Sequence, residues 1–496
     1  MEPSRNPDFA IGIIGAGFAG IIAAMQLRRH GRQDFILFER AKAIGGTWRD
    51  NTYPGCACDV PSHVYSISAA PNPDWSRMFS PQPEILAYMQ GVVRAEGLEA
   101  HIRYDADIVH AAFDEALGIW TVTDRQGRSV TVKAIIAALG PLNRAKWPEI
   151  PGMASFRGRA FHTSQWDHDL DLKGKRVAVI GTGASAIQVV PAIAPVVGQL
   201  TVFQRTAAWL SNRNDHAIPA RQRERFRRFP SVQRLLRHII YELMELRGRL
   251  FIGNRWMHGI LNRQSLAKLR REVQDPGTRR KLTPDYKIGC KRILLSDDYW
   301  PAFNRPNVQL VTDAIAEIVP EGLRTADGKL HPVDVIIFGT GFEAAEINTD
   351  ARVIGRDGRE LFAEWAKTGM EAHRGTTISG YPNFTYLLGP NTGLGHSSVL
   401  HIMESQMPYI LQYLDLLDRQ GPKGFLDVRA EAQAAFNADL QARFKGTVWA
   451  SGCKSWYLNA DGKNTTLYPR LTREFRKRMA RLDAESYAHH AGTGIS

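Results

Sequence analysis

Short apolar runs alternate with helical patterns along most of this chain. Residues 10–14, AIGII, are apolar throughout, as is typical of a strand buried on both faces of a parallel sheet. The segment 21–31, IIAAMQLRRHG, predicts a helix that ends at a glycine. DFILFER at 34–40 predicts the next strand, and VKAIIAALGP at 132–141 predicts a strand that returns to the same sheet. This alternation predicts an α/β fold.

The same order of strand, glycine turn and helix recurs in the middle of the chain. KRVAVIGTGASAIQVV at 175–190 repeats it, and LTVFQR at 200–205 predicts the following strand. VDVIIFGTGFE, from Val333, predicts a strand and turn that return the chain to its first lobe. We therefore expect two Rossmann-like dinucleotide-binding domains with an inserted helical subdomain. The expected boundaries are 1–145 for the first part of domain one, 146–340 for domain two with the insertion at about 213–285, and 341–496 for the second part of domain one with a C-terminal substrate-side segment.

The inserted segment is strongly basic. Residues 221–249 hold nine arginines and three glutamates, and apolar residues recur there at helical spacing: Leu235, Leu236, Ile239, Ile240, Leu243 and Leu246. This pattern predicts one or two amphipathic helices. Contact with a membrane surface or a partner is one interpretation. A solvated basic face is favoured, because charge runs usually only interact with water.

Composition narrows the class of protein. A length of 496 residues suits two or three domains, and 44% hydrophobic with 23% charged residues is ordinary for a globular protein. No apolar run is long enough for a transmembrane helix, and the N-terminus lacks the apolar core of a signal peptide. The four cysteines do not form a disulfide framework, so a cytoplasmic location is expected. Much of the net charge of +13 lies in the insertion, and we expect no nucleic-acid partner.

The first glycine turn carries a dinucleotide-binding fingerprint. Gly15 permits the tight turn, Gly17 lets the backbone approach a pyrophosphate, and Gly20 lets the helix pack closely on the strand. Phe18 and Ala19 complete the loop. Glu39 follows Gly15 by 24 residues, where an acid accepts hydrogen bonds from ribose hydroxyls. The order of strand, loop, helix, strand and acid is far more specific than the glycines alone.

The second fingerprint differs at the residue that contacts the ribose. Its first two glycines are Gly181 and Gly183, and Ala186 stands in the third position. Arg205 follows Gly181 by 24 residues, and a guanidinium there pairs with a 2′-phosphate that an acid would repel. The second site is therefore expected to prefer NADPH over NADH. Other residues placed on its loop, helix and strand end are Thr182, Ala184, Ser185, Gln188 and Thr206.

The stretch between the two fingerprints is FRGRAFHTSQWD, residues 156–167. Its pattern, Phe-x-Gly-x-x-x-His-x-x-x-Trp-Asp, resembles that of the Baeyer–Villiger flavin monooxygenases, and the resemblance extends over nearly the whole chain. An interdomain linker is the alternative for this stretch alone, but two flanking nucleotide fingerprints disfavour it. His162 is expected at a hinge or interdomain contact rather than as an acid or base.

The resemblance implies FAD in the first site and NADPH in the second. It places flavin-lining residues in the segment GGTWRDNTYPGCACDVPSHVYSIS, and it places the backbone near Ile108 at the adenine end of FAD. Lys291 is expected to reach the NADPH phosphate, and Trp456 is expected beside the nicotinamide nucleotide. The residues of the flavin segment that this assignment includes are Thr47, Trp48, Ala57, Cys58, Asp59 and Tyr65.

The implied reaction inserts one oxygen atom of dioxygen beside a ketone carbonyl through a flavin peroxide, giving an ester or lactone. Arg292 is the expected catalytic residue, because a fixed guanidinium stabilises the anionic oxygens that this reaction requires, and Asp59 would orient it. No metal is expected. The alternatives are a flavin monooxygenase that oxidises nitrogen or sulfur, a flavin reductase or oxidase, and a flavoprotein that binds a membrane or partner with little turnover.

Overall fold

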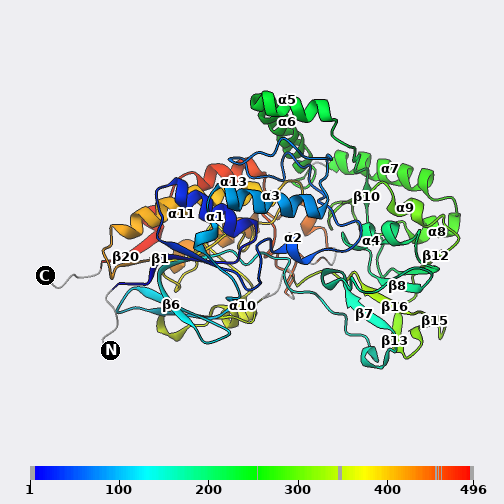
Figure 1. Cartoon of the computed structure of the whole chain (residues 1–496), viewed down its shortest axis with the longest axis horizontal. Helices are drawn as coiled ribbons and strands as arrows, with labels where there is room; N and C mark the ends of the chain where they lie inside the picture. Colours follow the sequence, from blue (N-terminus) through cyan, green and yellow to red (C-terminus); the bar gives the residue numbers. More distant parts are fainter. Residues whose placement is uncertain are drawn as a thin grey trace.

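The computed structural model describes residues 6–253, 255–343, 349–452, 455, 457–459 and 461–491. Two α/β lobes lie side by side, each built on its own sheet, and a pair of helices projects from the body of the molecule (Figure 1). The strands at the centre of both sheets are the short apolar runs, and nearly all of their residues are buried. In the part of the chain that the structure describes, no helix is both long and apolar enough to cross a membrane.

The first lobe contains an eight-stranded sheet in the order β17-β4-β5-β6-β1-β2-β3, with β18 paired to the end of β6. Strands β18, β6, β1, β2 and β3 are parallel, whereas β4, β5 and the start of β6 form an antiparallel meander. Helices α1, α3 and α11 cover one face, and α10 packs with the meander on the other. The bounds are β1 (Phe9–Ile14), α1 (Phe18–Arg29), β2 (Phe35–Phe38), α2 (Thr47–Asp50), α3 (Gln82–Ala95), β3 (Ile102–Arg103), β4 (Ile108–Asp114), β5 (Ile119–Asp124), β6 (Ser129–Ala137), β17 (Arg352–Ile354), α10 (Leu361–Thr368), β18 (Phe384–Tyr386) and α11 (Val399–Asp418).

The second lobe is built on a five-stranded, fully parallel sheet in the order β12-β9-β8-β16-β7. A small antiparallel sheet of β13, β14 and β15 packs on it through a separate apolar core. The bounds are β7 (Arg159–His162), β8 (Arg176–Ile180), α4 (Ala186–Ile193), β9 (Gln199–Phe203), α9 (Tyr299–Ala302), β12 (Val308–Val311), β13 (Ile315–Val319), β14 (Gly322–Thr325), β15 (Leu330–Pro332) and β16 (Val335–Phe338).

The insertion is helical and begins and ends at a two-stranded parallel ribbon. Its elements are β10 (Leu210–Ser211), α5 (Ala220–Arg228), α6 (Pro230–Gly248), α7 (Arg255–Glu272), α8 (Pro276–Lys281) and β11 (Leu294–Leu295). The C-terminal part packs on the first lobe, and its elements are β19 (Phe425–Val428), α12 (Ala430–Ala442), α13 (Thr472–Met479) and β20 (Tyr487–His490). Single 3-10 turns occur at η1 (Glu99–His101), η2 (Met153–Ser155), η3 (Thr163–Gln165), η4 (Arg356–Gly358), η5 (Val448–Ala450) and η6 (Ala484–Ser486).

The chain crosses between the lobes twice, and the two crossing segments are bonded to each other. The Lys146 amide donates to the Gly341 carbonyl at 2.9 Å, and Ala145 bridges Phe342. His162, the histidine of the stretch 156–167, is fully buried there, with its ring 5.9 Å from that of Trp147 and 5.8 Å from that of Phe342. Burial lowers the pKa of His162 to about 4, so its ring is neutral and serves as a packing element of this crossing.

Candidate active site

The first glycine loop has no room for a side chain at Gly15 or Gly20, the first and third glycines of the fingerprint. A methyl group on Gly20 would lie 1.9 Å from the Gly15 carbonyl oxygen, and Gly15 itself has a φ of 106°. A Cβ on Gly46 would lie 3.2 Å from Gly17 Cα. Two bare stretches of backbone therefore approach each other at the start of α1, as a bound pyrophosphate requires.

Glu39 follows β2 and is almost fully buried. Its carboxylate accepts hydrogen bonds from the backbone amides of Ala16 and Ala41, both at 2.9 Å, and from Arg49 Nη1 at 2.8 Å. The negative charge is therefore balanced by groups of the same lobe. The Ala106 amide donates to the Glu39 carbonyl at 2.9 Å, which brings the start of β4 beside this carboxylate. Arg49 was not identified from the sequence, because no motif relates an arginine to a glutamate ten residues before it.

An aromatic cluster lines the same loop. Trp48 Nε1 donates to Tyr65 Oη at 3.0 Å, and the Tyr65 ring meets the Phe18 ring edge-on with centroids 5.4 Å apart. Thr47 is the first residue of the short helix α2 that carries Trp48. The structure thus brings together three residues expected to line the flavin, Thr47, Trp48 and Tyr65, with Phe18 of the first glycine loop.

The second glycine loop is more open than the first. Gly183 and Ala184 are exposed, and a Cβ on Gly183 would meet no atom within 4 Å. Thr182 Oγ1 donates to the Thr206 carbonyl at 2.9 Å, which ties the loop to the end of β9. A methyl group is accommodated at Ala186 because Gly339 faces it, where an added Cβ would lie 3.1 Å away. The loop is therefore shaped by glycines from two segments.

Gln188 joins the two lobes. Its amide oxygen accepts from Tyr53 Oη at 3.0 Å and from the Ala57 amide at 3.4 Å, and its Nε2 donates to the Ala57 carbonyl at 3.0 Å. A Cβ on Gly55 would lie 2.7 Å from the Gln188 carbonyl oxygen, so the segment packs directly on α4. Gln188 lies on α4, the helix on which the sequence placed it, and from there it holds the expected flavin segment of the other lobe.

Arg205 and Lys291 are two cations brought close together. Arg205 is exposed, and in the described part of the chain neither residue makes an ion pair. Burial lowers the pKa of Lys291, and the nearby charge of Arg205 lowers it further. The Lys291 ammonium lies 4.7 Å from the centre of the Tyr286 ring, which holds it by a cation–π contact. This is the charge arrangement expected of a site for a phosphate monoester.

Arg292 and Asp59 meet between the lobes. Arg292 Nη2 lies 2.5 Å from Asp59 Oδ2, with 39% and 26% of the two side chains exposed. The negative charge of Asp59 raises the pKa of the Arg292 guanidinium, which stays charged at every accessible pH. The pair therefore places a permanent cation, with donors still open to solvent, beside the flavin segment.

Both members of this pair are held by their backbone neighbours. Arg213 Nη2 donates to the Cys58 carbonyl at 3.0 Å, directly before Asp59. The Leu294 amide donates to the Trp209 carbonyl at 2.9 Å, two residues beyond Arg292. Tyr457 is buried within electrostatic range of the pair, and burial raises its pKa to about 12. Arg213 and Tyr457 were not identified from the sequence, because neither belongs to a spaced motif.

Other predicted residues have structural surroundings of their own. Asp167 pairs with Arg159 at 2.6 Å, and the Trp166 ring packs on Phe161 of β7. Burial raises the pKa of Cys58, and it raises that of Cys56 to about 11, so neither thiol ionises near neutral pH. Trp456 lies outside the described residues. Within the described ranges, no three His, Cys, Asp or Glu side chains are placed to hold a metal ion.

The chain is similar to known proteins in sequence and in structure. Residues 13–81 match a family model described as an NAD(P)-binding Rossmann-like domain, and residues 75–217 match one described as L-lysine 6-monooxygenase/L-ornithine 5-monooxygenase. The chain is similar to a Baeyer–Villiger monooxygenase of Streptomyces coelicolor, with 46% identity over 96% of this chain and 92% of the relative. It is 45% identical to a Baeyer–Villiger monooxygenase of Pseudomonas aeruginosa, over 98% of this chain and 92% of the relative. The crystal structure of OTEMO in complex with FAD and NADP superimposes with a TM-score of 0.87 at 27% identity, covering 98% of this chain and all of the other.

Proposed function

This chain belongs to the Baeyer–Villiger monooxygenases. We propose that Arg292, held by Asp59, is the catalytic residue for insertion of oxygen beside a ketone carbonyl. The observation that carries this proposal is their 2.5 Å ion pair, which joins the expected flavin segment of the first lobe to the segment between α8 and β11. The pair thus links the two lobes that carry the two glycine loops.

FAD fits the first loop and NADPH the second. The OTEMO structure holds FAD and NADP, and this chain offers a backbone cradle at Gly17 and Gly46 for one and the two unpaired cations for the other. FAD, when reduced by NADPH, supplies the activation of dioxygen. The proposed domains are 1–145, 146–340 and 341–496, and the two segments that cross between the lobes are bonded to each other beside His162.

The contribution of this chain to the chemistry is mainly electrostatic. Attack on a ketone needs a nucleophilic, anionic oxygen and produces a second anionic oxygen on the former carbonyl. The Arg292 guanidinium offers several donors in a fixed plane and remains charged, so it stabilises both oxygens in turn. Asp59 orients the guanidinium through one nitrogen and leaves the others for the reacting atoms. The aromatic cluster of Trp48, Tyr65 and Phe18 would help to exclude water near this pair, since Tyr65 lies within electrostatic range of Asp59 and Arg292.

The match of residues 75–217 to lysine and ornithine monooxygenases favours oxidation of an amine as the second candidate. Oxidation of an amine uses an electrophilic oxygen, which gains nothing from a neighbouring guanidinium. The experiment is NADPH consumption by the FAD-loaded protein with a panel of ketones and with L-lysine and L-ornithine, under labelled dioxygen. We expect one labelled oxygen in an ester or lactone. Labelled hydroxylamine products, with no ester from any ketone, would replace the proposal by the second candidate.

A further inference from the structure

The hairpin of α5 and α6 presents an apolar face to solvent. Of the nine large apolar side chains that are exposed in the described part of the chain, six lie between residues 229 and 260. Leu235, Ile239, Leu243 and Leu246 of α6 are 59%, 47%, 55% and 50% exposed. At about 100° per residue these four fall within an arc of about 80° and extend over about 16 Å of helix. The solvent-exposed side of α6 therefore carries an apolar stripe. The solvated basic face that the sequence favoured describes the exposed arginines of this hairpin but not the stripe itself.

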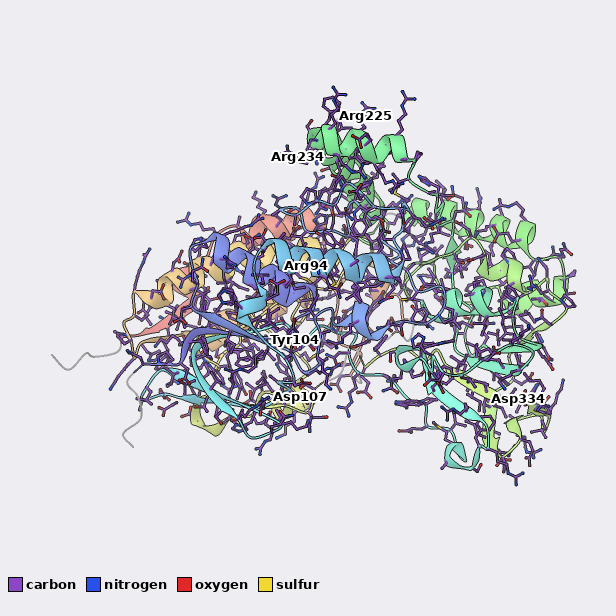
Figure 2. All side chains as sticks on the ribbon, in the orientation of Figure 1. Arg94, Tyr104, Asp107, Arg225, Arg234 and Asp334 are labelled. Atoms are coloured by element: carbon purple, nitrogen blue, oxygen red, sulfur yellow. The ribbon has the colours of Figure 1, made fainter. Side chains whose placement is uncertain are left out.

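Exposed arginines lie on both helices of this hairpin. Arg221, Arg225 and Arg228 of α5 recur at intervals of four and three residues, so they share one side of that helix. Figure 2 shows Arg225 and Arg234 at the projecting end of the hairpin. Among the described residues, no ion pair neutralises six of the exposed arginines here: Arg221, Arg225, Arg228, Arg234, Arg247 and Arg249.

The opposite face of α6 is firmly attached to the body of the protein. Arg237 Nη1 donates to the carbonyls of His63 and Ser66 at 2.6 and 2.9 Å. Glu245 is buried, lies 3.2 Å from His396 and accepts from the Thr472 amide at 3.1 Å. The hairpin is thus fixed in place by buried polar contacts and by Ile240 and Met244, which pack against the main core. The side of α6 that carries the four exposed apolar residues faces outward, and among the described residues Leu471 and Arg473 border it.

We infer that this hairpin docks on an anionic lipid surface, with the four apolar side chains of α6 inserted at the level of the acyl chains and the arginines contacting lipid phosphates. Helices that bind membrane surfaces combine an apolar face with basic residues. The burial of apolar side chains and the attraction to anionic headgroups both contribute to the free energy of binding. A second copy of this chain is a poor occupant, since a symmetric contact would oppose arginines to arginines. A projecting ridge also fits a flat bilayer better than it fits a protein groove (Figure 1).

A hollow beside α6 extends this surface. It has a volume of about 390 Å³ and lies between α6 and the start of α13, with Ile239, Leu243 and Leu471 in its wall and with Glu242, Glu245, Arg249 and Arg473 among the lining residues. Arg473 pairs with both glutamates. An acyl chain in the hollow would therefore leave its phosphate to Arg249, for which the described residues provide no ion pair. The same helix reaches the loop 389–398 through the contact between Glu245 and His396, so the lipid-facing element is joined to the part of the first lobe that precedes α11.

The test is co-sedimentation of the FAD-loaded protein with vesicles of phosphatidylcholine alone or mixed with phosphatidylglycerol. We expect binding to the anionic vesicles only, and weaker binding as salt is raised. The double variant I239Q/L243Q should lower the partition coefficient roughly tenfold to a hundredfold for each side chain. Removing Arg225 and Arg234 as R225Q/R234Q should lower it about fivefold for each. Matched controls are V196Q, an exposed apolar residue of the second lobe, and R94Q, an exposed arginine of α3.

All variants should retain FAD and oxidise NADPH as the wild type does, because none of the changed residues contacts the proposed site. Absence of binding to anionic vesicles at low salt would overturn the inference. So would equal binding by I239Q/L243Q and wild type, which would mean adsorption by charge alone. A dimer in sedimentation velocity that I239Q/L243Q abolishes, without vesicle binding, would assign the apolar face to a second copy instead.

Discussion

The two nucleotide-binding lobes use the same strand, loop and helix but differ in how they handle charge. In the first lobe, Glu39 is buried and already satisfied by two backbone amides and Arg49. In the second lobe, the equivalent residue Arg205 is exposed and shares its surroundings with Lys291, a second cation. In the first site, the negative charge of Glu39 is balanced by groups of the protein itself. In the second site, Arg205 and Lys291 repel each other, and a bound anion would reduce that repulsion.

This difference matches two kinds of occupant. A cofactor that stays bound needs a site organised before it arrives, and a closed loop with an internally balanced carboxylate meets that need. A nucleotide that enters and leaves in every cycle needs an open loop and a charge that attracts it over a distance. Arg292 and Asp59 lie between the two lobes. Substitutions there should therefore affect oxygen insertion and flavin reduction by NADPH differently, rather than weaken the binding of one nucleotide.

Replacing Arg292 should have the largest effect. Arg292→Ala should lower ester formation by on the order of a hundredfold to a thousandfold, because anionic oxygens lose their stabilising donor. Reduction by NADPH should continue, so NADPH should be consumed with release of hydrogen peroxide. Stopped-flow absorbance for reduction and mass spectrometry for products measure the two parts. Ester formation near the wild-type rate would exclude Arg292 as the catalytic residue. Asp59→Ala should show a smaller loss, and Arg352→Ala, at an exposed arginine on β17, should show none.

Exchanging glycine and alanine at the equivalent loop positions tests the shape of the two sites. Gly20→Ala places a methyl group 1.9 Å from a backbone oxygen, so the first lobe should lose about 1–3 kcal/mol and bind FAD correspondingly less tightly. Ala186→Gly removes a tolerated methyl group and should cost about 1 kcal/mol through helix propensity, with FAD retained. Thermal unfolding and flavin absorbance after dialysis measure both. Equal FAD loss in the two variants would show that loop shape does not distinguish the sites.

Arg205 should decide the choice between nicotinamide nucleotides. Arg205→Ala should reduce the preference for NADPH over NADH roughly tenfold to a hundredfold, since a charge-assisted contact to phosphate contributes about 1.5–3 kcal/mol. The kcat/KM ratio for the two nucleotides is the measurement, and Arg94→Ala serves as the control at an exposed arginine elsewhere. An unchanged ratio would mean that the 2′-phosphate lies in another pocket.

The smallest expected effect concerns pH. The pKa of Lys291 is lowered, so its charge is complete below that lowered value and is lost as pH rises through it. The preference for NADPH should therefore decline on the alkaline side, by up to about fivefold. In Arg205→Ala one cause of the lowered pKa is removed, so the decline should move to higher pH. A profile of KM for NADPH against pH, with NADH as reference, measures this. A decline that stays at the same pH in the variant would show that Arg205 does not act on Lys291.

Much of the fold could be predicted from sequence, because strands buried on both faces and glycine loops have strong local patterns. Gly15, Gly20 and Gly181 are constrained by contacts within a few residues or by the adjoining strand, and such constraints are visible in spacing. The alternation of apolar runs likewise predicts the parallel sheets. The α/β class and the two Rossmann-like lobes were therefore predicted correctly.

The parts that could not be predicted depend on contacts between distant segments. Gln188 reaches Tyr53 and Ala57 across the lobes, which no helix pattern reveals. Tyr457 lies beside Arg292 although many residues separate them along the chain. The outward apolar face of α6 is also invisible in sequence, because helical spacing shows that a stripe exists and not which side is buried.

The return of the chain to its first sheet has a consequence for biosynthesis. β18, at Phe384–Tyr386, pairs with β6, and α11 covers the same lobe. A ribosome delivers the complete second sheet, which ends with β16 at Phe338, well before it delivers these residues. Domains fold as units once their residues are available. The lobe that begins the chain is therefore the last to close, and the newly made protein can first enclose its flavin only after about four fifths of the polypeptide has been synthesised.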